Sequence, residues 1–529
     1  MVGFEWQTTG RHRSNYFNLG LYLLLPGPGC SGYEVLFVHD VGTKSHLIQL
    51  YPIVEKLLEN GHHVTTIFFS RGNIKHQNYT EIVVKNVFES KMAELSKLFM
   101  DRGSENAVIN TIKQMKFAIE AWSEVLEESA LMYWDSPEIH RMIKTGRNFE
   151  AVITSYQQHC LLAEIFNSSL ITFSPAGPVP WLLAATGNEI NLSVQPLLTS
   201  GFIEPMTFRQ RLMNHLENAV RQFTTTYSAA KIYEVRARRM GFHDSYKEVL
   251  SSRFSIFLSN HHPVTHGAWP YLPNIIEVGG LTLREPSTLP SHFQTFLDSS
   301  DAVVLVSFGS TLQPSQMPQD KLDILYEVFR SLPDYSFIWK WDGQIPDVPT
   351  NVLISSWLPQ QDLLAHPNIK TFITHGGLGG ITEAIYHKVT LVGIPFGNDQ
   401  ISNLERASRH GYCQLLFWEK LSVETLRGAI RESMESETMQ AALERVHSLY
   451  TDREKSPVER AVWWIEYVCR HGGANILQSS VWPVAWYQYH HLDILLFITL
   501  ISLVVAAILL FLCSLCCRCC RWGQKVKKD

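Results

Sequence analysis

Residues 351–400 read NVLISSWLPQQDLLAHPNIKTFITHGGLGGITEAIYHKVTLVGIPFGNDQ. In this stretch, short runs rich in β-branched residues (NVLISS, IKTFITHGG and TLVGIPF) alternate with segments of helical character. Strict alternation of strands and helices is typical of a parallel sheet that carries helices on its faces. The stretch therefore predicts a Rossmann-like α/β domain, with its ligand site at the carboxyl ends of the strands.

The same alternation extends upstream in two series. One series begins at Ala302 with AVVLVSFGS, and an earlier one begins at Tyr33 with YEVLFVHD, a helical stretch and the strand HHVTTIFFS. Between the series lies a linker, NIIEVGGLTLREPSTLPS, whose prolines and glycines mark a boundary. We therefore predict an α/β fold of two tandem Rossmann-like domains, residues 33–284 and 285–455, that face each other across a cleft.

The C-terminal region holds an uncharged apolar run, ILLFITLISLVVAAILLFLC, at Ile494–Cys513. About 20 apolar residues span the roughly 30 Å hydrocarbon core of a bilayer, so we predict a transmembrane helix at 494–513. Residues 514–529 carry five Lys and Arg residues against one Asp, which predicts a cytosolic tail and a lumenal body. Aromatic residues precede the span within residues 456–493, where an interfacial belt is expected: Trp482, Trp486, Tyr487 and Tyr489.

The N-terminal residues 1–32 have the order of a secretory signal peptide. Arg11 and Arg13 precede the apolar run Phe17–Leu25, and small residues follow. A buried first strand is the alternative, but the sequence PGPG at 26–29 fits a processing region better.

The ending KVKKD at 525–529 resembles a dilysine-type retrieval signal, which implies residence in the endoplasmic reticulum. Asn78, Asn167 and Asn191 begin glycosylation acceptor sequences, as expected of a lumenal chain.

Composition and cysteine placement exclude several classes of protein. The chain has 529 residues, 45% of them hydrophobic, and a net charge of -5, so it offers neither the composition of a disordered protein nor a basic field for nucleic acid. Of nine cysteines, only Cys160, Cys413 and Cys469 fall in the predicted lumenal body, which gives no disulfide framework. Five cysteines from 513 to 520 adjoin the membrane, where S-acylation is a better interpretation than metal binding.

A glycine-rich turn follows one strand of the quoted stretch and opens a helix. Such a turn directs backbone N–H groups and the positive end of a helix toward an anion, although glycine runs alone are weak evidence. Here His375 stands immediately before the turn, and Asp399 and Gln400 end the next strand at the same sheet edge. An imidazole, an anion nest, a carboxylate and an amide together suit a nucleotide diphosphate that bears a polyhydroxyl group.

Residues 351–400 closely resemble the UDP-glycosyltransferases, in particular the membrane-bound glucuronosyltransferase-like branch, and the resemblance extends from about Tyr33 to the tail. It implies the GT-B arrangement of the two domains, with the C-terminal one binding a UDP-sugar. It also implies a role for each matching residue, as follows: Trp357 and Gln360 hold the uracil, His375 and Ser310 lie at the diphosphate, Gly377, Gly379 and Gly380 supply backbone donors, Glu383 accepts the ribose hydroxyls, and Asp399 and Gln400 bind the sugar.

Two departures from the family pattern stand in this region. Gly379 and Gly380 replace the usual asparagine and serine, and Thr390 replaces a usual proline. The glycines keep their backbone donors but lose side-chain donors, so diphosphate affinity is expected to fall by ~1 kcal/mol for each lost hydrogen bond.

The resemblance implies that the N-terminal domain binds the acceptor and that His46 is the general base. His39, His62 and His63 are nearby alternatives, and His62 is expected to be structural because it begins a strand at the opposite sheet edge. The acidic partner that the family places beside the base falls here on Ser155. We expect Ser155 to orient His46 but not to offset its charge, which favours acidic acceptors such as phenols.

The resemblance further implies an inverting reaction that uses no metal or other cofactor, and a helix at 456–466 that returns to the N-terminal domain. Glucuronate-using members carry an arginine where this chain reads Ala268-Trp269-Pro270, so we expect glucose as the sugar. The predicted function is conjugation of a small lipophilic hydroxyl compound, of the detoxification type, by a chain that is open to homo- or hetero-oligomer formation. Two alternatives remain: a non-catalytic UDP-sugar-binding or partner subunit that has lost its acidic dyad member, and a membrane receptor.

Overall fold

The computed structural model describes residues 32–525, apart from residues 90, 92–93, 95, 98–123, 131, 185, 189, 311, 344–346 and 479–484. The predicted signal peptide, with Cys30, therefore lies outside the described residues except for Gly32. The same holds for Trp482 and for residues 526–529 of the predicted retrieval signal.

The first domain is built on a seven-stranded parallel sheet with the order β3-β2-β1-β4-β5-β6-β7. The central strands are buried along nearly their whole length because helices cover both faces, which is why their sequences are continuously apolar. The strands are β1 Glu34–His39, β2 His63–Phe68, β3 Tyr79–Val83, β4 Ala151–Thr154, β5 Ser169–Ser174, β6 Phe254–Ser259 and β7 Ile275–Glu277.

Two hydrophobic clusters cover the two faces of this sheet. One contains Leu36, Val38 and Val152, and the other contains Val35, Phe37 and Ile153, as the alternation of side chains along strands requires. The helices are α1 Lys44–Leu47, α2 Tyr51–Glu59, α5 Pro137–Lys144, η2 Gln157–His159, α6 Cys160–Ile165, α7 Pro180–Ala184, α8 Phe208–Arg239, α9 Tyr246–Arg253 and α10 Pro263–His266.

The second domain has a six-stranded parallel sheet with the order β10-β9-β8-β11-β12-β13. Its strands are β8 Val303–Ser307, β9 Ser336–Lys340, β10 Val352–Ser355, β11 Ile369–Thr374, β12 Thr390–Gly393 and β13 Cys413–Leu415. Its helices are α11 Ser291–Asp298, η3 Pro314–Gln316, α12 Gln319–Ser331, α13 Gln360–Leu364, α14 Leu378–His387, α15 Gln400–Arg409, η4 Trp418–Lys420, α16 Val423–Glu435 and α17 Glu437–Thr451. The prediction of two parallel-sheet α/β domains is confirmed.

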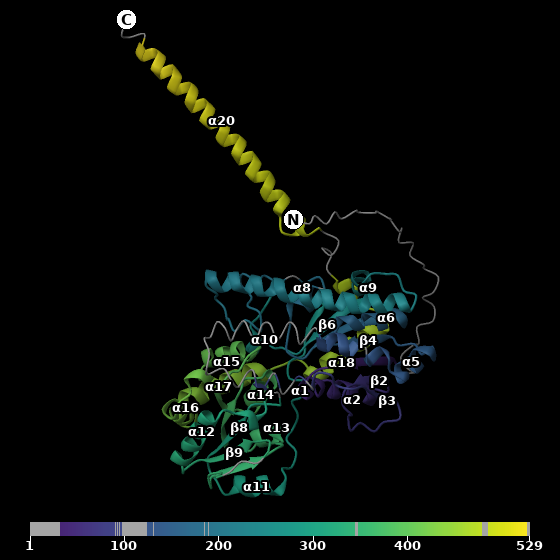
Figure 1. The fold of residues 1–529 in the computed structure, drawn as a ribbon, viewed down its shortest axis with the longest axis vertical. Helices are drawn as coiled ribbons and strands as arrows, with labels where there is room; N and C mark the ends of the chain where they lie inside the picture. The colour runs from purple at the N-terminus through teal and green to yellow at the C-terminus, as the bar shows by residue number, and fades with distance from the viewer. Residues whose placement is uncertain are drawn as a thin grey trace.

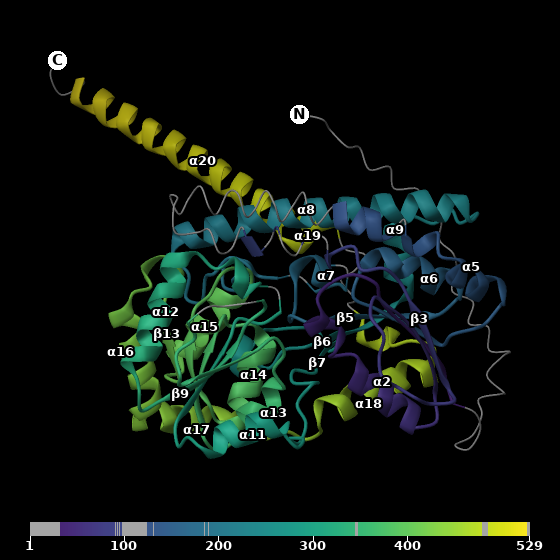
Figure 2. The same cartoon turned by 60° about the horizontal axis from the view of Figure 1, so that its bottom comes forward.

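The two domains lie side by side and are joined again near the C-terminus (Figure 1, Figure 2). Helix α18, Pro457–His471, begins with a capping box at Ser456 and packs its apolar face into the core of the first domain. Glu466 of α18 accepts a hydrogen bond from Asn60 and bonds to His62, which precedes β2 and so lies at the edge of the sheet opposite the carboxyl ends. The short helices η5 Asn475–Leu477 and α19 Trp486–Tyr489 follow.

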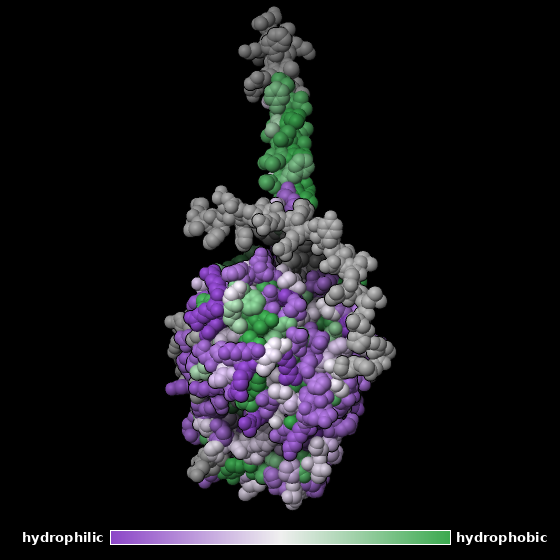
Figure 3. Space-filling view, turned by 90° about the vertical axis from the view of Figure 1, so that its right-hand side faces the viewer, coloured by the Kyte–Doolittle hydropathy of each residue, from purple (hydrophilic) through white to green (hydrophobic). Residues whose placement is uncertain are grey.

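Helix α20, Leu492–Lys525, extends away from both domains (Figure 1). Its segment Leu492–Leu515 has 24 residues, a mean hydropathy of 3.2 and no buried part. Figure 3 shows it as a hydrophobic column beside a body with a largely hydrophilic surface. A 24-residue helix is about 36 Å long, so α20 is long and apolar enough to anchor the chain in a membrane.

Candidate functional site

The carboxyl ends of four strands in the six-stranded sheet of the second domain carry the predicted binding residues. Ser310 follows β8, Trp357 follows β10, His375 follows β11 and Asp399 follows β12. These strands are parallel, so their carboxyl ends share one edge of the sheet. The structure thus brings to one edge residues that are up to 89 positions apart in the chain, from Ser310 to Asp399.

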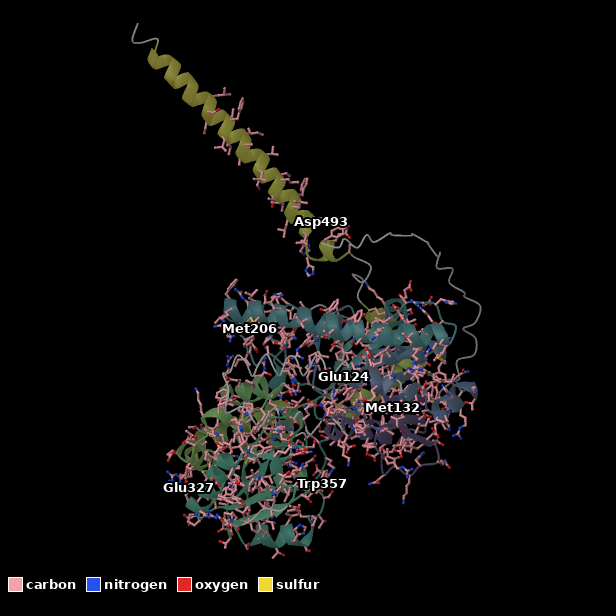
Figure 4. All side chains as sticks on the ribbon, in the orientation of Figure 1. Glu124, Met132, Met206, Glu327, Trp357 and Asp493 are labelled. Atoms are coloured by element: carbon pink, nitrogen blue, oxygen red, sulfur yellow. The ribbon has the colours of Figure 1, made fainter. Side chains whose placement is uncertain are left out.

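Trp357 presents an exposed ring at this edge. Its side chain is 69% exposed, and its backbone carbonyl accepts a hydrogen bond of 2.7 Å from Ser355 Oγ. Figure 4 places Trp357 on the flank of the second domain. A large aromatic side chain left open in this way offers a flat surface on which a base can stack.

Gln360, three residues after Trp357, forms a hydrogen-bonded pair with Glu383. Gln360 Nε2 donates to Glu383 Oε2 over 2.6 Å, which joins α13 to α14. Burial raises the pKa of Glu383 to about 7, although the hydrogen bond from Gln360 and the charge of Arg284 oppose the rise. Glu383 is therefore a carboxyl group whose charge changes near neutral pH.

His375 is held between two glycine-containing loops. A Cβ atom at Gly309 or at Gly377 would lie within 3.0 Å of its ring, so both positions need glycine. Burial, with a smaller contribution from Lys340, lowers the pKa of His375 to about 4, and its Nδ1 has no partner among the described residues. The structure therefore indicates a neutral imidazole, because the surrounding protein removes water from the ring.

Lys340 is a residue of this edge that the sequence analysis did not identify. It is the last residue of β9, and its Nζ donates a 2.7 Å hydrogen bond to the carbonyl of Gly309, beside His375. Burial lowers its pKa. A single lysine at a strand end gives no signal in the sequence, and only the order of strands places it next to the glycine loop.

The glycines at the start of α14 differ in the space around them. Gly377 is the N-cap, so the first N–H groups of α14 point to this edge. A Cβ at Gly379 would meet nothing within 4 Å, whereas one at Gly380 would lie 3.2 Å from Phe372. The position where the family carries asparagine thus has room for a side chain, and the next position is tight.

Asp399 and Gln400 are held by the protein itself. Asp399 Oδ2 accepts a 2.8 Å hydrogen bond from Asn403, and burial raises the pKa of Asp399. Gln400 is buried, and its Oε1 accepts hydrogen bonds from the backbone N–H groups of Phe396 and Gly397. Gln400 therefore shapes the loop after β12 with its oxygen, which leaves its amide nitrogen as the group for a ligand.

In the first domain, His46 lies in α1, directly after β1, and is partly exposed. Burial of its ring nitrogens lowers its pKa to about 4. His39, the last residue of β1, lies nearby, because a Cβ at Gly42 would be 3.5 Å from His39 Nε2 and 3.9 Å from His46 Nδ1. The two imidazoles therefore flank Gly42.

Ser155 does not contact His46 as expected, and this expectation is corrected. Its Oγ lies 2.9 Å from Nδ1 of His39. The reason is strand register: β1 and β4 pair with Val38 opposite Thr154, which sets the following residues, His39 and Ser155, side by side. His39 is buried, and its Nε2 has no partner among the described residues. Burial, with the neighbouring His46, lowers its pKa to about 3.

A buried carboxylate, that of Asp40, does lie at the carboxyl edge of the first sheet, but its hydrogen bonds are made with residues other than His46. Asp40 accepts from His159 Nε2 at 3.0 Å and from Ser129 Oγ at 2.7 Å. Burial opposes ionisation of Asp40, yet His159 and Ser129 hold its pKa below the usual value. The acid implied by the resemblance would follow β4, whereas Asp40 follows β1.

The Ala268-Trp269-Pro270 element lies at a narrow pocket between the domains. The pocket is lined by Pro178, Pro180, Ile190, Gln195, Pro196, Leu197, Leu198, His266, Trp269 and Arg406. Arg406 is the only lining residue with a permanent positive charge, and Glu204 binds it through both carboxylate oxygens at 2.5 and 2.6 Å. No guanidinium in this lining is free to bind a second carboxylate.

Comparisons with known proteins agree with this geometry. Residues 35–528 match the family model described as "UDP-glucoronosyl and UDP-glucosyl transferase". UDP-glucosyltransferase 2 of Dactylopius coccus is 32% identical over 88% of this chain and 90% of its own length, and UDP-glucuronosyltransferase 2B33 of Macaca mulatta is 27% identical over 86% and 88%. A UDP-glucosyltransferase from Polygonum tinctorium, solved in complex with 3,4-dichloroaniline, shares the fold with a TM-score of 0.55 at 15% identity, over 83% of this chain and 99% of that one.

Proposed function

The chain belongs to the family of UDP-glucuronosyl and UDP-glucosyl transferases, and on that premise we propose that it transfers glucose from UDP-glucose to a hydroxyl group of a small lipophilic acceptor. Use of a UDP-sugar is common to the family. The choice of glucose is supported by one observation above all: both carboxylate oxygens of Glu204 bind the guanidinium of Arg406, the one arginine that lines the pocket beside Trp269, so it is not available to a glucuronate carboxylate. Burying that carboxylate without a partner would be costly.

In the proposed donor complex the uracil stacks on Trp357, and Gln360 borders it. Ionised Glu383 accepts the ribose hydroxyls. The diphosphate lies against Ser310, His375 and the first N–H groups of α14, with Gly377, Gly379 and Gly380 as backbone donors. Asp399 and the amide nitrogen of Gln400 bind the sugar hydroxyls. The neutral His375 acts as a hydrogen-bond donor to a phosphate oxygen.

In the proposed reaction His46 is the general base, and it takes the proton of the acceptor hydroxyl as the oxygen attacks the anomeric carbon. The bond between that carbon and the β-phosphate oxygen breaks, and UDP leaves from the opposite face with the electron pair. This displacement inverts the anomeric centre. Burial lowers the pKa of His46 to about 4, so the imidazole is unprotonated and available at neutral pH, while the same shift makes it a weaker base.

The acceptor preference follows from what surrounds His46. Ser155 is hydrogen-bonded to His39, and neither group carries a negative charge that would stabilise a protonated His46. A phenol loses its proton more readily than an aliphatic alcohol, so it depends less on the basicity of His46. We expect phenols to be the better substrates.

We also propose residence in the endoplasmic reticulum membrane, with both domains lumenal, and a reaction that needs no metal.

The test is transfer by the purified full-length chain in lipid nanodiscs, with UDP-glucose or UDP-glucuronate, against a matched panel of phenols and aliphatic alcohols. Glucosides of phenols with inverted configuration are expected, in equal yield with and without EDTA. Efficient glucuronate transfer would overturn the sugar assignment, and loss of activity in EDTA would overturn the metal-free reaction. UDP binding without transfer to any acceptor would show the non-catalytic alternative instead.

A further inference from the structure

Helix α8 has an exposed apolar face that no part of the proposed chemistry uses. Phe208, Leu212, Leu216, Val220, Phe223 and Tyr227 recur at helical spacing on one side, and we call them the α8 stripe. Phe208, Phe223 and Tyr227 are 74%, 69% and 61% exposed. A helix on the surface of a soluble domain normally turns such side chains toward the core. A continuous exposed apolar surface of this kind marks an interaction site.

The stripe faces outward because contacts on the opposite side of α8 fix the orientation of this helix. The opposite side of the helix is buried at Asn214 and, further along, at Ile232 and Tyr233. Asn214 accepts from the N–H of Leu197 and donates to two backbone carbonyls, so the N-terminal half is fixed by hydrogen bonds. The capping box of Thr207 and Gln210 defines the start of the helix. The hydrogen bonds of Asn214 therefore prevent a rotation of α8 about its axis that would bury the stripe.

The face that carries α8 is also the face from which the membrane anchor leaves. In both ribbon views α8 is the layer of the body next to α20 (Figure 1, Figure 2), and Met206 marks its N-terminal end in Figure 4. The exposed apolar side chains of α8 therefore lie on the side of the body from which α20 extends toward a bilayer.

The flanks and the end of the stripe fit a bilayer surface. Arg209 and Arg211 are exposed near its beginning and have no acidic partner among the described residues, so they can bind acidic headgroups. After Tyr227 the exposed positions become charged, as at Lys231, Glu234 and Arg238. The apolar surface thus covers the first 20 residues of the helix, about 30 Å, between polar borders. This is the pattern of a helix that lies in the plane of a membrane interface.

We propose that the α8 stripe rests on the lipid bilayer and forms a second, peripheral attachment beside α20. The chain is then held to the membrane at two places, and the orientation of both domains relative to the bilayer is defined. Insertion of the apolar side chains supplies the binding, and Arg209 and Arg211 make it stronger on acidic lipids. This proposal does not depend on the donor, the acceptor or the catalytic base.

The test separates the two attachments in the full-length chain. A protease site is inserted after Gln478, and the protein is placed in nanodiscs of phosphatidylcholine with or without one fifth phosphatidylserine. After cleavage the discs are captured through their scaffold protein, and the released body is measured. We expect most of the wild-type body to stay on acidic discs. A Phe208→Ser, Leu212→Ser, Phe223→Ser variant should be retained at least tenfold less.

Val235→Ser is the matched control, because Val235 is 48% exposed on the same helix but lies outside the stripe. It should be retained like the wild type, and all variants should keep their melting temperature and UDP affinity. Release of the wild-type body as complete as that of the stripe variant would overturn the proposal. Retention through a second copy of the chain, seen as dimers of the cleaved body without discs, would overturn it too. Equal retention on neutral and acidic discs would overturn the role of the arginines.

Discussion

The carboxyl edges of the two sheets differ in how residues come together. At the edge of the second domain, the residues named from one 50-residue stretch meet as neighbours, and Gln360 and Glu383 are bonded over 2.6 Å. At the edge of the first domain, the expected pair of His46 and Ser155 is replaced by His39 and Ser155. The difference teaches that a pair from consecutive elements, here α13 and α14 on either side of β11, keeps its geometry, whereas a pair that follows two separate strands depends on their register.

The largest expected effect separates the two edges by function. His46→Ala should lower the turnover number for phenol glucosylation by roughly 10²- to 10⁴-fold, the usual contribution of a general base. UDP affinity should not change, because His46 belongs to the first domain. His140→Ala, an exposed histidine of α5, is the control and should be neutral. Full activity of the His46→Ala enzyme would show that another residue is the general base, and His39 would be the first residue to test.

The next effect concerns the donor edge. His375→Ala should weaken UDP binding by about 10- to 100-fold, as expected for a hydrogen bond to a charged group of ~1.5–3 kcal/mol. Its effect on the melting temperature should be small beside that, because its Nδ1 makes no hydrogen bond to the described residues. Titration calorimetry with UDP and thermal unfolding measure the two quantities. If both fall in proportion, His375 supports the fold rather than the ligand.

A third effect is the pH dependence that Glu383 gives to the donor edge. Its pKa is about 7 in the folded chain against 4.5 in the unfolded one, so the folded state binds more protons between these values. This contribution to the free energy of unfolding is fully present below pH 4.5 and is lost as the pH rises through 7, and it amounts to about 3 kcal/mol. UDP affinity should change in the opposite sense, because only the ionised carboxylate accepts two ribose hydroxyls. Glu383→Gln should flatten both curves between pH 5.5 and 8.5.

The smallest effect tests the corrected pairing at the acceptor edge. If Ser155 oriented His46, Ser155→Asp should improve aliphatic alcohols selectively. Because Ser155 is bonded to His39 instead, the new carboxylate should raise the pKa of His39 and leave His46 without a direct partner. We therefore expect less than a threefold change in alcohol turnover. A selective gain of tenfold or more, measured beside a phenol control, would restore His46 as the partner of position 155.

The match between sequence and structure is uneven for physical reasons. The two sheets follow from the alternation of apolar strands and helices, and the membrane-anchor helix follows from its composition. The neutral state of His375 is not readable from the sequence, because burial and the neighbouring Lys340 depend on contacts from other strands. The engagement of Arg406 by Glu204 was also absent from the sequence analysis, because it joins residues 202 positions apart.

The sequence by itself determined the fold class, the glycine turn before α14 and the apolar span of α20, since each depends on periodicity or composition within one segment. The tertiary structure alone decided the partner of Ser155, the isolation of Asp40 with His159, and the outward direction of the α8 stripe. The register of β1 against β4 decides the partner of Ser155. The direction in which Asp40 points, just after β1, decides that it bonds to His159. The third depends on which face of α8 its hydrogen bonds fix to the body. Such choices involve residues whose spacing along the chain carries no information about their distance in space.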